Sequence, residues 1–272
     1  MTAQPARYRV LACASLARPV YAAAARSDAV VTVEVLPQGF HDRPRRLRTE
    51  LQERIDTTAP DEVDAVLLVY GLCGAGTAGL VAPGVPLVMA RAHDCITLRL
   101  GSRERYDEEF RACPGTYWMS RDFLERNRRG DVATLGVSPR GYQDLVDKHG
   151  AENAAYIAEV MQRWAAHYQR LVYLEGSDPE PDCYRLEAEQ KARRWQLAMQ
   201  TLPSDHRLVD ALLAGDWGPE FLVVAPGNRV AVGSAEQVVT EQIVPEQKVP
   251  EPIVPEQNVT EQIVPEQKGR PR

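Results

Sequence analysis

Three cysteines stand where apolar runs of the chain end, and a histidine and an aspartate directly precede the third. Cys13 follows the string YRVLA, Cys73 lies in VLLVYGLCG, and the string PLVMARAHDC ends in His93, Asp94 and Cys95. Thiolates and a neutral imidazole are the ligands that zinc and iron–sulfur clusters prefer in proteins. We therefore expect Cys13, Cys73 and Cys95 to be metal ligands or reactive thiols.

The spacing of His93 and Cys95 places both side chains on one side of an extended segment, whereas a helix would separate them. We expect His93 to act as a further ligand or as a proton carrier. Asp94 would orient the imidazole ring through a hydrogen bond. The alternative is structural, because a buried free cysteine is a common small core residue and the chain has no CxxC pair.

A second histidine and two arginines extend the predicted site. His41 precedes a helix that Pro44 opens, so it is a candidate fourth metal ligand or acid–base group, with an ordinary turn residue as the alternative. Arg91 stands two residues before His93 and is a third catalytic candidate beside His93 and Asp94. Arg91 or Arg105 would pair with a carboxylate or phosphate of a small substrate, or form a salt bridge that closes the loop.

The loop at residues 71–79, GLCGAGTAG, holds Gly74, Gly76 and Gly79 in the order G-x-G-x-x-G directly after an apolar run. Such a loop cradles a phosphate on free amides at the start of a helix. It predicts a nucleotide or S-adenosylmethionine site as an alternative function. Cys73 inside the loop is foreign to the dinucleotide fingerprint, and the glycines would equally let the backbone pass close to Cys73 or to an anion.

Alternating strands and helices must position these residues. Strands are expected at residues 8–12, 30–36, 63–70 and 86–90, with helices at 16–27 and 44–57, where apolar residues recur four apart. The pattern indicates an α/β fold with a mostly parallel sheet flanked by helices, finished by a strand at residues 115–119. The carboxyl ends of such strands line one ligand crevice, which brings the three cysteines together.

The remainder of the chain divides into a helix-rich part and a tail. After a loop at residues 131–139 we expect helices at 151–170 and 182–201 and strands at 171–174 and 221–224, so residues 1–233 form one domain with a sheet-forming part (1–130) and a helix-rich part (131–233). Residues 234–272 read as a low-complexity tail of pentads such as IVPEQ. Its regular prolines favour polyproline II or disorder over a helix or a β-ladder, and we expect the tail to be dispensable.

Composition excludes several classes of protein. The 272 residues carry a formal net charge of −6, which argues against nucleic-acid binding. No run reaches the roughly 18 apolar residues that a membrane span requires, and the first residues lack the apolar core of a secretory signal. We expect a cytoplasmic protein with no membrane partner, in which the five scattered cysteines stay reduced.

The strings YGLCG, RAHDC and PGTY resemble a bacterial and archaeal family known as domain of unknown function 1638. The matching residues are Tyr70–Gly74, Arg91–Cys95, Leu100–Ser102, Tyr106 and Pro114–Tyr117, together with Leu11–Cys13 and the His-x-x-Pro of His41–Pro44. The resemblance implies that Cys13, His41, Cys73, His93 and Cys95 work together. It also implies a setting in one-carbon or methyl-group metabolism, since members often occur beside corrinoid-dependent methyltransferase components, which makes such a component a candidate partner.

Three functions remain open from the sequence. The leading one is a zinc or iron–sulfur protein that acts on a small molecule through the Cys/His cluster. The second is binding of a nucleotide or S-adenosylmethionine at Gly74–Gly79. The third is a non-catalytic accessory that delivers or protects a cofactor and uses its tail to find a partner.

Overall fold

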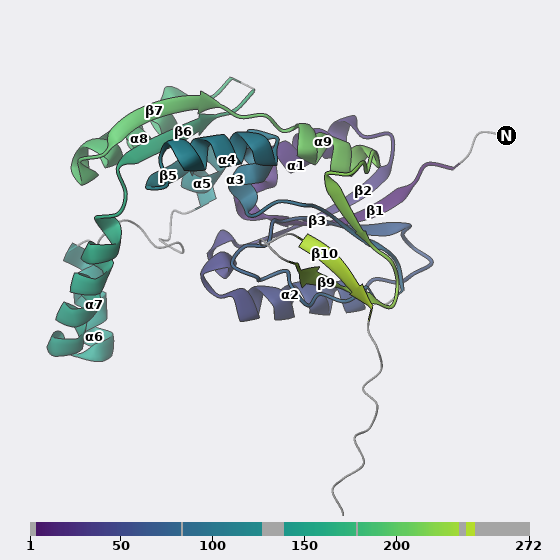
Figure 1. Ribbon diagram of the computed structural model, residues 1–272, viewed down its shortest axis with the longest axis horizontal. Helices are drawn as coiled ribbons and strands as arrows, with labels where there is room; N and C mark the ends of the chain where they lie inside the picture. The colour runs from purple at the N-terminus through teal and green to yellow at the C-terminus, as the bar shows by residue number, and fades with distance from the viewer. Residues whose placement is uncertain (1–3, 83, 127–138, 178, 234–237, 243–272) are drawn as a thin grey trace, which may run out of the picture.

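A computed structural model of the chain describes residues 4–82, 84–126, 139–177, 179–233 and 238–242; for a few of these, His41 among them, the side chain is outside the description. Within this part of the chain, no helix is both long and apolar enough to cross a membrane. The described residues form a mostly parallel sheet, a second sheet that is fully parallel, and a small hairpin (Figure 1). The last strand of the first sheet follows the second sheet in the chain.

The first sheet has five strands in the order β2-β1-β3-β4-β8. Its first four strands run parallel, and β8 pairs antiparallel with β4. Every residue of β3 and β4 is buried, as expected for parallel strands that are covered on both faces. The predicted α/β fold with a mostly parallel sheet is therefore confirmed. The strands are β1 (Arg7–Cys13), β2 (Val30–Leu36), β3 (Ala65–Val69), β4 (Leu87–Ala90) and β8 (Phe221–Val224).

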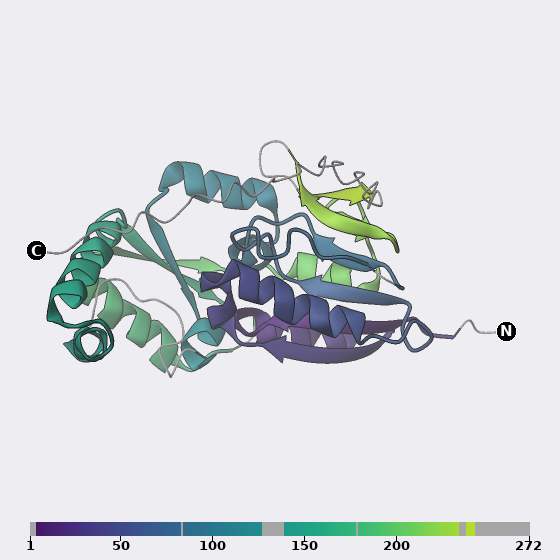
Figure 2. The same cartoon turned by 90° about the horizontal axis from the view of Figure 1, so that it is seen from below.

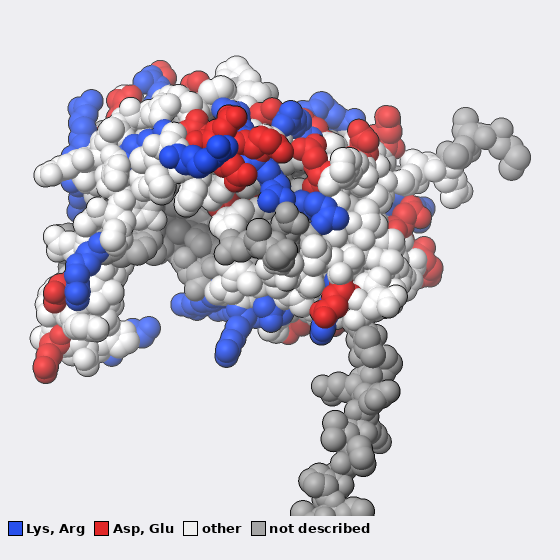
Figure 3. Space-filling model, in the orientation of Figure 1, with Lys and Arg blue, Asp and Glu red and all other residues white. Residues whose placement is uncertain are grey.

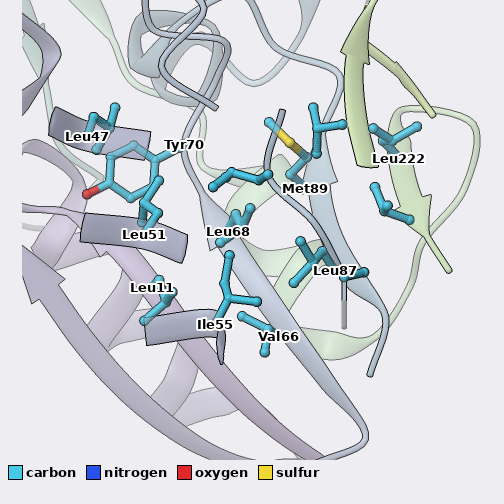
Figure 4. Packing of buried hydrophobic residues seen from close by; sticks show 14 of the residues in the cluster. Leu11, Leu47, Leu51, Ile55, Val66, Leu68, Tyr70, Leu87, Met89 and Leu222 are labelled. Atoms are coloured by element: carbon cyan, nitrogen blue, oxygen red, sulfur yellow. The ribbon is translucent and has the colours of Figure 1, made fainter. Parts of the chain in front are cut away.

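Helices cover both faces of this sheet (Figures 1 and 2). Helices α1 (Ala17–Arg26) and α9 (Arg207–Ala214) pack on one face, and α2 (Pro44–Asp56) packs on the other. The apolar stripe predicted for α2 is buried in one cluster with the sheet residues Leu11 and Leu68 (Figure 4). Burial of each such side chain contributes about 1.5–3 kcal/mol to stability. The stripe consists of Leu47, Leu51 and Ile55.

The second sheet has three parallel strands in the order β5-β6-β7, which are β5 (Thr116–Ser120), β6 (Arg170–Glu175) and β7 (Ala198–Pro203). The segment at 115–119 was expected to finish the first sheet, and that expectation is wrong, because β5 opens the second one. Its partner β6 lies far along the chain. The two are joined at Gly115, whose carbonyl accepts hydrogen bonds from the amides of Gln169 and Arg170.

The helices around the second sheet include α3 (Cys95–Leu100), α4 (Arg103–Ala112), α5 (Arg121–Arg126) and α8 (Asp182–Trp195). The helix expected at 182–201 ends early, since Gln196 adopts a left-handed φ of 57° and its amide closes the last turn. Helices α6 (Pro139–His149) and α7 (Ala151–Ala165) pack on each other at the end of the molecule away from the first sheet (Figures 1 and 2). Most of the loop expected at 131–139 lies outside the described residues.

Part of the expected tail is ordered as a strand. β10 (Val238–Gln242) pairs antiparallel with β9 (Asn228–Val232), so the expectation that no β-ladder runs through the first pentad is wrong. That pentad, VVTEQ, has Thr240 where most others have proline, so all its backbone donors are present. The later pentads lie outside the described residues.

Candidate thiol site

The strand order of the first sheet creates a crevice at its carboxyl edge. The chain passes from β1 to β2 on one side and then to β3 on the other side of β1, and ligands of open α/β sheets bind at such a switch point. Cys13 is the last residue of β1, and Cys95 is the first residue of α3 after β4. Cys73 follows β3 by four residues. The three cysteines therefore reach one edge from three neighbouring strands.

Backbone hydrogen bonds hold the loops after β3 and β4 against each other. The amide of Leu72 donates to the carbonyl of Ala92 at 3.0 Å, and the amide of Cys73 donates to the carbonyl of His93 at 3.1 Å. Gly71 makes this approach possible, because a Cβ atom there would lie 2.6 Å from the backbone nitrogen and Cα of Asp94. The pairing of these loops fixes where Cys73 lies relative to Cys95.

The Cys95 thiol contacts both of the other thiols, Cys13 and Cys73. The side chains of Cys13 and Cys73 each form a hydrogen bond with the side chain of Cys95. These hydrogen bonds raise the pKa of both thiols well above the ordinary value, and burial raises it further. The hydroxyl of Ser15 donates a hydrogen bond to the sulfur of Cys13 at 3.2 Å, which acts in the opposite direction on its pKa. Cys13 and Cys73 are therefore neutral thiols at neutral pH.

A buried phenol lies beside the thiols on the side of the core. The hydroxyl of Tyr70 is buried and has no hydrogen-bond partner among the described residues. Burial raises the pKa of Tyr70, and the nearby Cys13, Cys73 and Cys95 raise it further. Buried polar groups normally find a partner, so this hydroxyl is a donor that lacks its acceptor.

Asp94 organises the rim of the site. One carboxylate oxygen caps α3 by accepting hydrogen bonds from the amides of Ile96 (2.9 Å) and Thr97 (3.1 Å). The other accepts a hydrogen bond from the Tyr106 hydroxyl at 3.3 Å and lies 3.5 Å from Nδ1 of His93. The rings of His93 and Tyr106 are stacked, with centroids 5.7 Å apart. The predicted role of Asp94 in orienting His93 is consistent with this contact, and Tyr106 joins it as a positioning residue.

Cys73, Cys95 and the rim face a crevice of about 430 Å³ between the two sheets, whereas Cys13 is buried behind them and does not line it. Cys73, His93, Asp94 and Cys95 line one wall. The opposite wall comes from the second sheet and its surroundings and is largely aromatic, with Tyr117, Trp118, Phe123 and Tyr168. The volume lies within the range of small-molecule sites, roughly 300–1,000 Å³, and an apolar, aromatic lining is typical of them.

The profile of a family described as protein of unknown function (DUF1638) matches residues 35–213 of the chain. The chain belongs to the DUF1638 family. The matched region includes Cys73, His93, Asp94 and Cys95, whereas Cys13 precedes it. No curated protein and no solved structure matches this DUF1638 protein.

Two further residues predicted for the site, Arg91 and Arg105, do not line this crevice. The guanidinium of Arg91 donates to the carbonyl of Phe221 at 3.2 Å, so Arg91 joins β4 to β8, and it is not among the residues that line the crevice. His41 lies in a short 3₁₀ helix (Gln38–Asp42), and its side chain is outside the described part. Arg105 lines a different cavity, between α1 and the end of the second sheet.

The glycine loop does not provide the phosphate cradle that its sequence pattern predicts. No helix begins directly after the loop, whose next element is β4. The amide of Gly76 donates to Cys73 and that of Gly79 donates to Val230, so neither is free for a phosphate. Gly74 lies in the left-handed region with a φ of 63°, as do Cys73 and Ala75. The loop instead turns the chain so that Cys73 faces the other thiols.

The described thiols are not arranged as a metal-binding site. Among the residues that the structure describes, no group of three or more His, Cys, Asp or Glu side chains is arranged to hold a metal ion.

The residues that sequence reasoning missed are Tyr70, Tyr106 and the aromatic wall. Tyr70, Tyr106 and Tyr117 of the aromatic wall do belong to the strings that carry the family resemblance, which was the one signal that could have pointed to them.

Proposed function

We propose that this DUF1638 protein binds a soft metal, zinc or an iron–sulfur cluster, through Cys13, Cys73 and Cys95, and acts on a small molecule in the crevice. The observation that carries the proposal is the contact of the Cys95 thiol with both Cys13 and Cys73 on neighbouring strand ends. A thiol that bonds two others beside a crevice is more than core packing requires. Thiolate sulfur is the donor type that both zinc and iron–sulfur clusters select.

The donor set fits such a metal in two respects. The three sulfurs come from the ends of neighbouring strands of one sheet, and the Cys95 thiol already contacts the other two. The unpartnered Tyr70 hydroxyl supplies a hydrogen bond to a thiolate, which is how the surroundings of a metal ligand commonly stabilise it. Binding requires the neutral thiols to lose their protons, so metal affinity rises with pH.

The remaining residues divide the chemistry between them. A bound metal would supply Lewis acidity or redox chemistry at the floor of the crevice. His93 is half exposed at the rim, where its imidazole can take or give a proton on the substrate side. Asp94 and Tyr106 hold that ring in place, and the aromatic wall shields the substrate from water.

The substrate class favoured by this proposal is a small molecule of one-carbon metabolism, and a corrinoid methyltransferase component is the proposed partner. This choice of substrate and partner rests on the family resemblance alone, because members of the family often occur beside corrinoid-dependent methyltransferase components. The crevice volume of about 430 Å³ is compatible with a small molecule.

The proposal predicts opposite effects for a site residue and a core residue. We expect Cys95→Ser to lose the metal, because a hard oxygen replaces a soft thiolate, with little change in stability. Leu68→Ala should keep the metal in the folded protein and lose about 2–5 kcal/mol, because Leu68 is fully buried in β3. The measurement is metal and sulfide content with the visible spectrum after purification without oxygen, together with the melting temperature.

Cys183→Ser is the matched control, since Cys183 is an exposed cysteine on α8. It should match the wild type in metal content and in melting temperature. A metal-free wild type would contradict the proposal. So would a Cys95→Ser protein that keeps the wild-type metal content and melts lower, which is the result expected of a thiol that only packs.

A further inference from the structure

A second cavity, of about 760 Å³, lies at the carboxyl ends of the strands of the second sheet. Its walls include Arg121 directly after β5, Gly176 directly after β6 and Ser204 directly after β7. Open α/β sheets bind ligands at this edge. The volume also lies within the range of small-molecule sites, roughly 300–1,000 Å³.

Six arginines line this cavity, which we call the arginine pocket: Arg18, Arg26, Arg99, Arg105, Arg121 and Arg207. This group of positive charges occurs in a chain whose formal net charge is −6. On the face shown in Figure 3, by comparison, acidic and basic side chains are interspersed. Four residues with carboxylates line the pocket as well, so its selectivity depends on which arginines are already neutralised.

Four of the arginines are held in ion pairs. Arg18 and Arg121 both bind the carboxylate of Glu125. The other two pairs are Arg99 with Asp122 and Arg26 with Asp210, each at 2.6 Å. These pairs build the wall of the pocket and leave little positive charge for a ligand.

Arg105 and Arg207 are placed differently. Arg105 donates to the carbonyls of Leu100 (3.3 Å) and Pro203 (2.8 Å), and within the described residues no ion pair with a carboxylate holds it. Arg207 donates from Nε to the carbonyl of Gly101 at 2.5 Å, with the carboxylate of Asp205 at 3.9 Å. Backbone carbonyls orient both guanidinium groups, and each group has five N–H donors to share. The charge of Arg105 has no carboxylate partner among the described residues, whereas Asp205 partly offsets that of Arg207.

Two buried polar atoms on the same wall lack partners. The hydroxyl oxygen of Ser204 and Nε2 of His206 are buried and form no hydrogen bond with described residues. Burial, and after it the charge of Arg99, lowers the pKa of His206, so the imidazole is neutral and donates from Nε2 in one tautomer. His206 stands at the N-terminus of α9, where backbone amides favour an anion. Buried polar atoms normally form hydrogen bonds, so two such atoms without a partner in one pocket indicate a ligand.

The carboxylates of the pocket have partners of their own. Glu180 accepts hydrogen bonds from the Tyr173 hydroxyl and the Gly176 amide. Asp122 binds Arg99 and also caps α1 by accepting a hydrogen bond from the Arg18 amide at 2.8 Å. Asp205 accepts a hydrogen bond from the amide of Arg207 at 3.0 Å. Arg99 neutralises Asp122. Glu180 and Asp205 are held in place by neutral donors and keep their negative charge, so an anion near Ser204 must gain more from the arginines than it loses to these two carboxylates.

We propose that the arginine pocket binds the phosphate group of a phosphorylated small molecule. Arg105 and Arg207 supply the charge, and Ser204 and His206 supply hydrogen bonds. A single phosphate fills only part of the volume, so the rest takes the organic part of the ligand. The site is separate from the thiols, although Arg99 borders both cavities, and it does not depend on the metal proposal.

The test uses the full chain with inorganic pyrophosphate as the probe, in isothermal titration calorimetry at constant ionic strength. We expect saturable binding to the wild type and at least a tenfold weaker affinity in Arg105→Gln. Arg111→Gln is the matched control, because Arg111 is exposed on the same helix, α4, and does not line the pocket. It should bind pyrophosphate as the wild type does.

Ser204→Ala keeps the test decisive if Arg105→Gln does not fold. It removes only an unpartnered hydroxyl, so we expect an unchanged or higher melting temperature with a severalfold weaker affinity. Absence of saturable pyrophosphate binding to the wild type would overturn the proposal, as would an affinity that both variants leave unchanged. Malonate is the parallel probe, and binding as tight as that of pyrophosphate would replace the phosphate assignment with a general carboxylate site.

Discussion

Cys95 decides the chemistry of the thiol site because it alone contacts both other thiols. Its hydrogen bonds are the largest cause of the raised pKa of Cys13 and of Cys73. Cys13 and Cys73 therefore keep their protons at neutral pH. Under the proposed function, a cation would replace these protons, and a thiolate would become a possible acceptor for the Tyr70 hydroxyl.

Tyr70→Phe distinguishes a role of the hydroxyl in the metal-free protein from a role in the proposed metal-bound protein. It removes a buried hydroxyl without a partner, so the metal-free protein should be as stable as the wild type or more stable by up to about 1 kcal/mol. Metal affinity should fall by roughly tenfold or more, because a hydrogen bond to a ligand is lost. Thermal melts of the metal-free protein and competition with a chelator measure the two effects. A variant that melts lower while its metal affinity is unchanged would show that the hydroxyl serves only the fold.

At the scale of elements, the site depends on two loops that pair like short strands. The convergence of Cys13, Cys73 and Cys95 could be predicted from the sequence, because the apolar runs before them mark strand ends and parallel strands share one edge. The Asp94–Tyr106 contact and the aromatic wall could not. They depend on how the second sheet packs against the first, which no local pattern in the sequence encodes.

Gly71→Ala tests the pairing of these loops. The new Cβ would meet backbone atoms of Asp94 at 2.6 Å, and backbone cannot yield as a flexible side chain does. We expect a loss of about 1–3 kcal/mol in chemical denaturation, with reduced metal content. Gly218→Ala is the matched control, because a Cβ there meets nothing within 4 Å. Equal stability of the two variants would refute the close approach.

The helices α1 and α5 are joined by an ion pair with a pH signature. The guanidinium of Arg18 is the largest cause that lowers the pKa of Glu125 to about 2, with Arg121 and Tyr184 contributing. A carboxyl group whose pKa is lower in the folded protein than in the unfolded chain stabilises the fold at pH values above its ordinary pKa, about 4.3. This stabilisation is lost as the pH falls toward the pKa of the group in the folded protein. Glu125→Gln should therefore be less stable than the wild type at pH 7, by about 1–3 kcal/mol, and the difference should shrink between pH 4.5 and 2. Denaturation across this range measures it, and a difference that is independent of pH would contradict the assignment.

At the scale of the whole molecule, two parallel sheets each end at a cavity, and a buried ion pair joins them. Arg99 and Asp122 are each 4% exposed, and they link α3 to α5 and, through the Arg18 amide, to α1. The sequence predicted the first sheet, whose strands are apolar runs. It predicted a helix in place of β7, because the residues of β7 are exposed or half-buried and give no apolar run.

The strand β10 is the last element that the structure describes, and it pairs with β9. β10 covers the edge of β9, whose Val230 is 1% exposed and bonded through its backbone to Leu80 and Gly79. A chain that stops after Gly233 loses β10, so we expect it to melt a few degrees lower, in line with a loss of about 1–2 kcal/mol. A chain that stops after Gln242 keeps the hairpin and loses only pentads, most of which carry proline and cannot extend a ladder, so it should melt with the full chain. Thermal melts of the three chains decide the matter. An equal melting temperature for all three would show that β10 adds nothing to stability, and a drop already at Gln242 would show that the later pentads dock on the body.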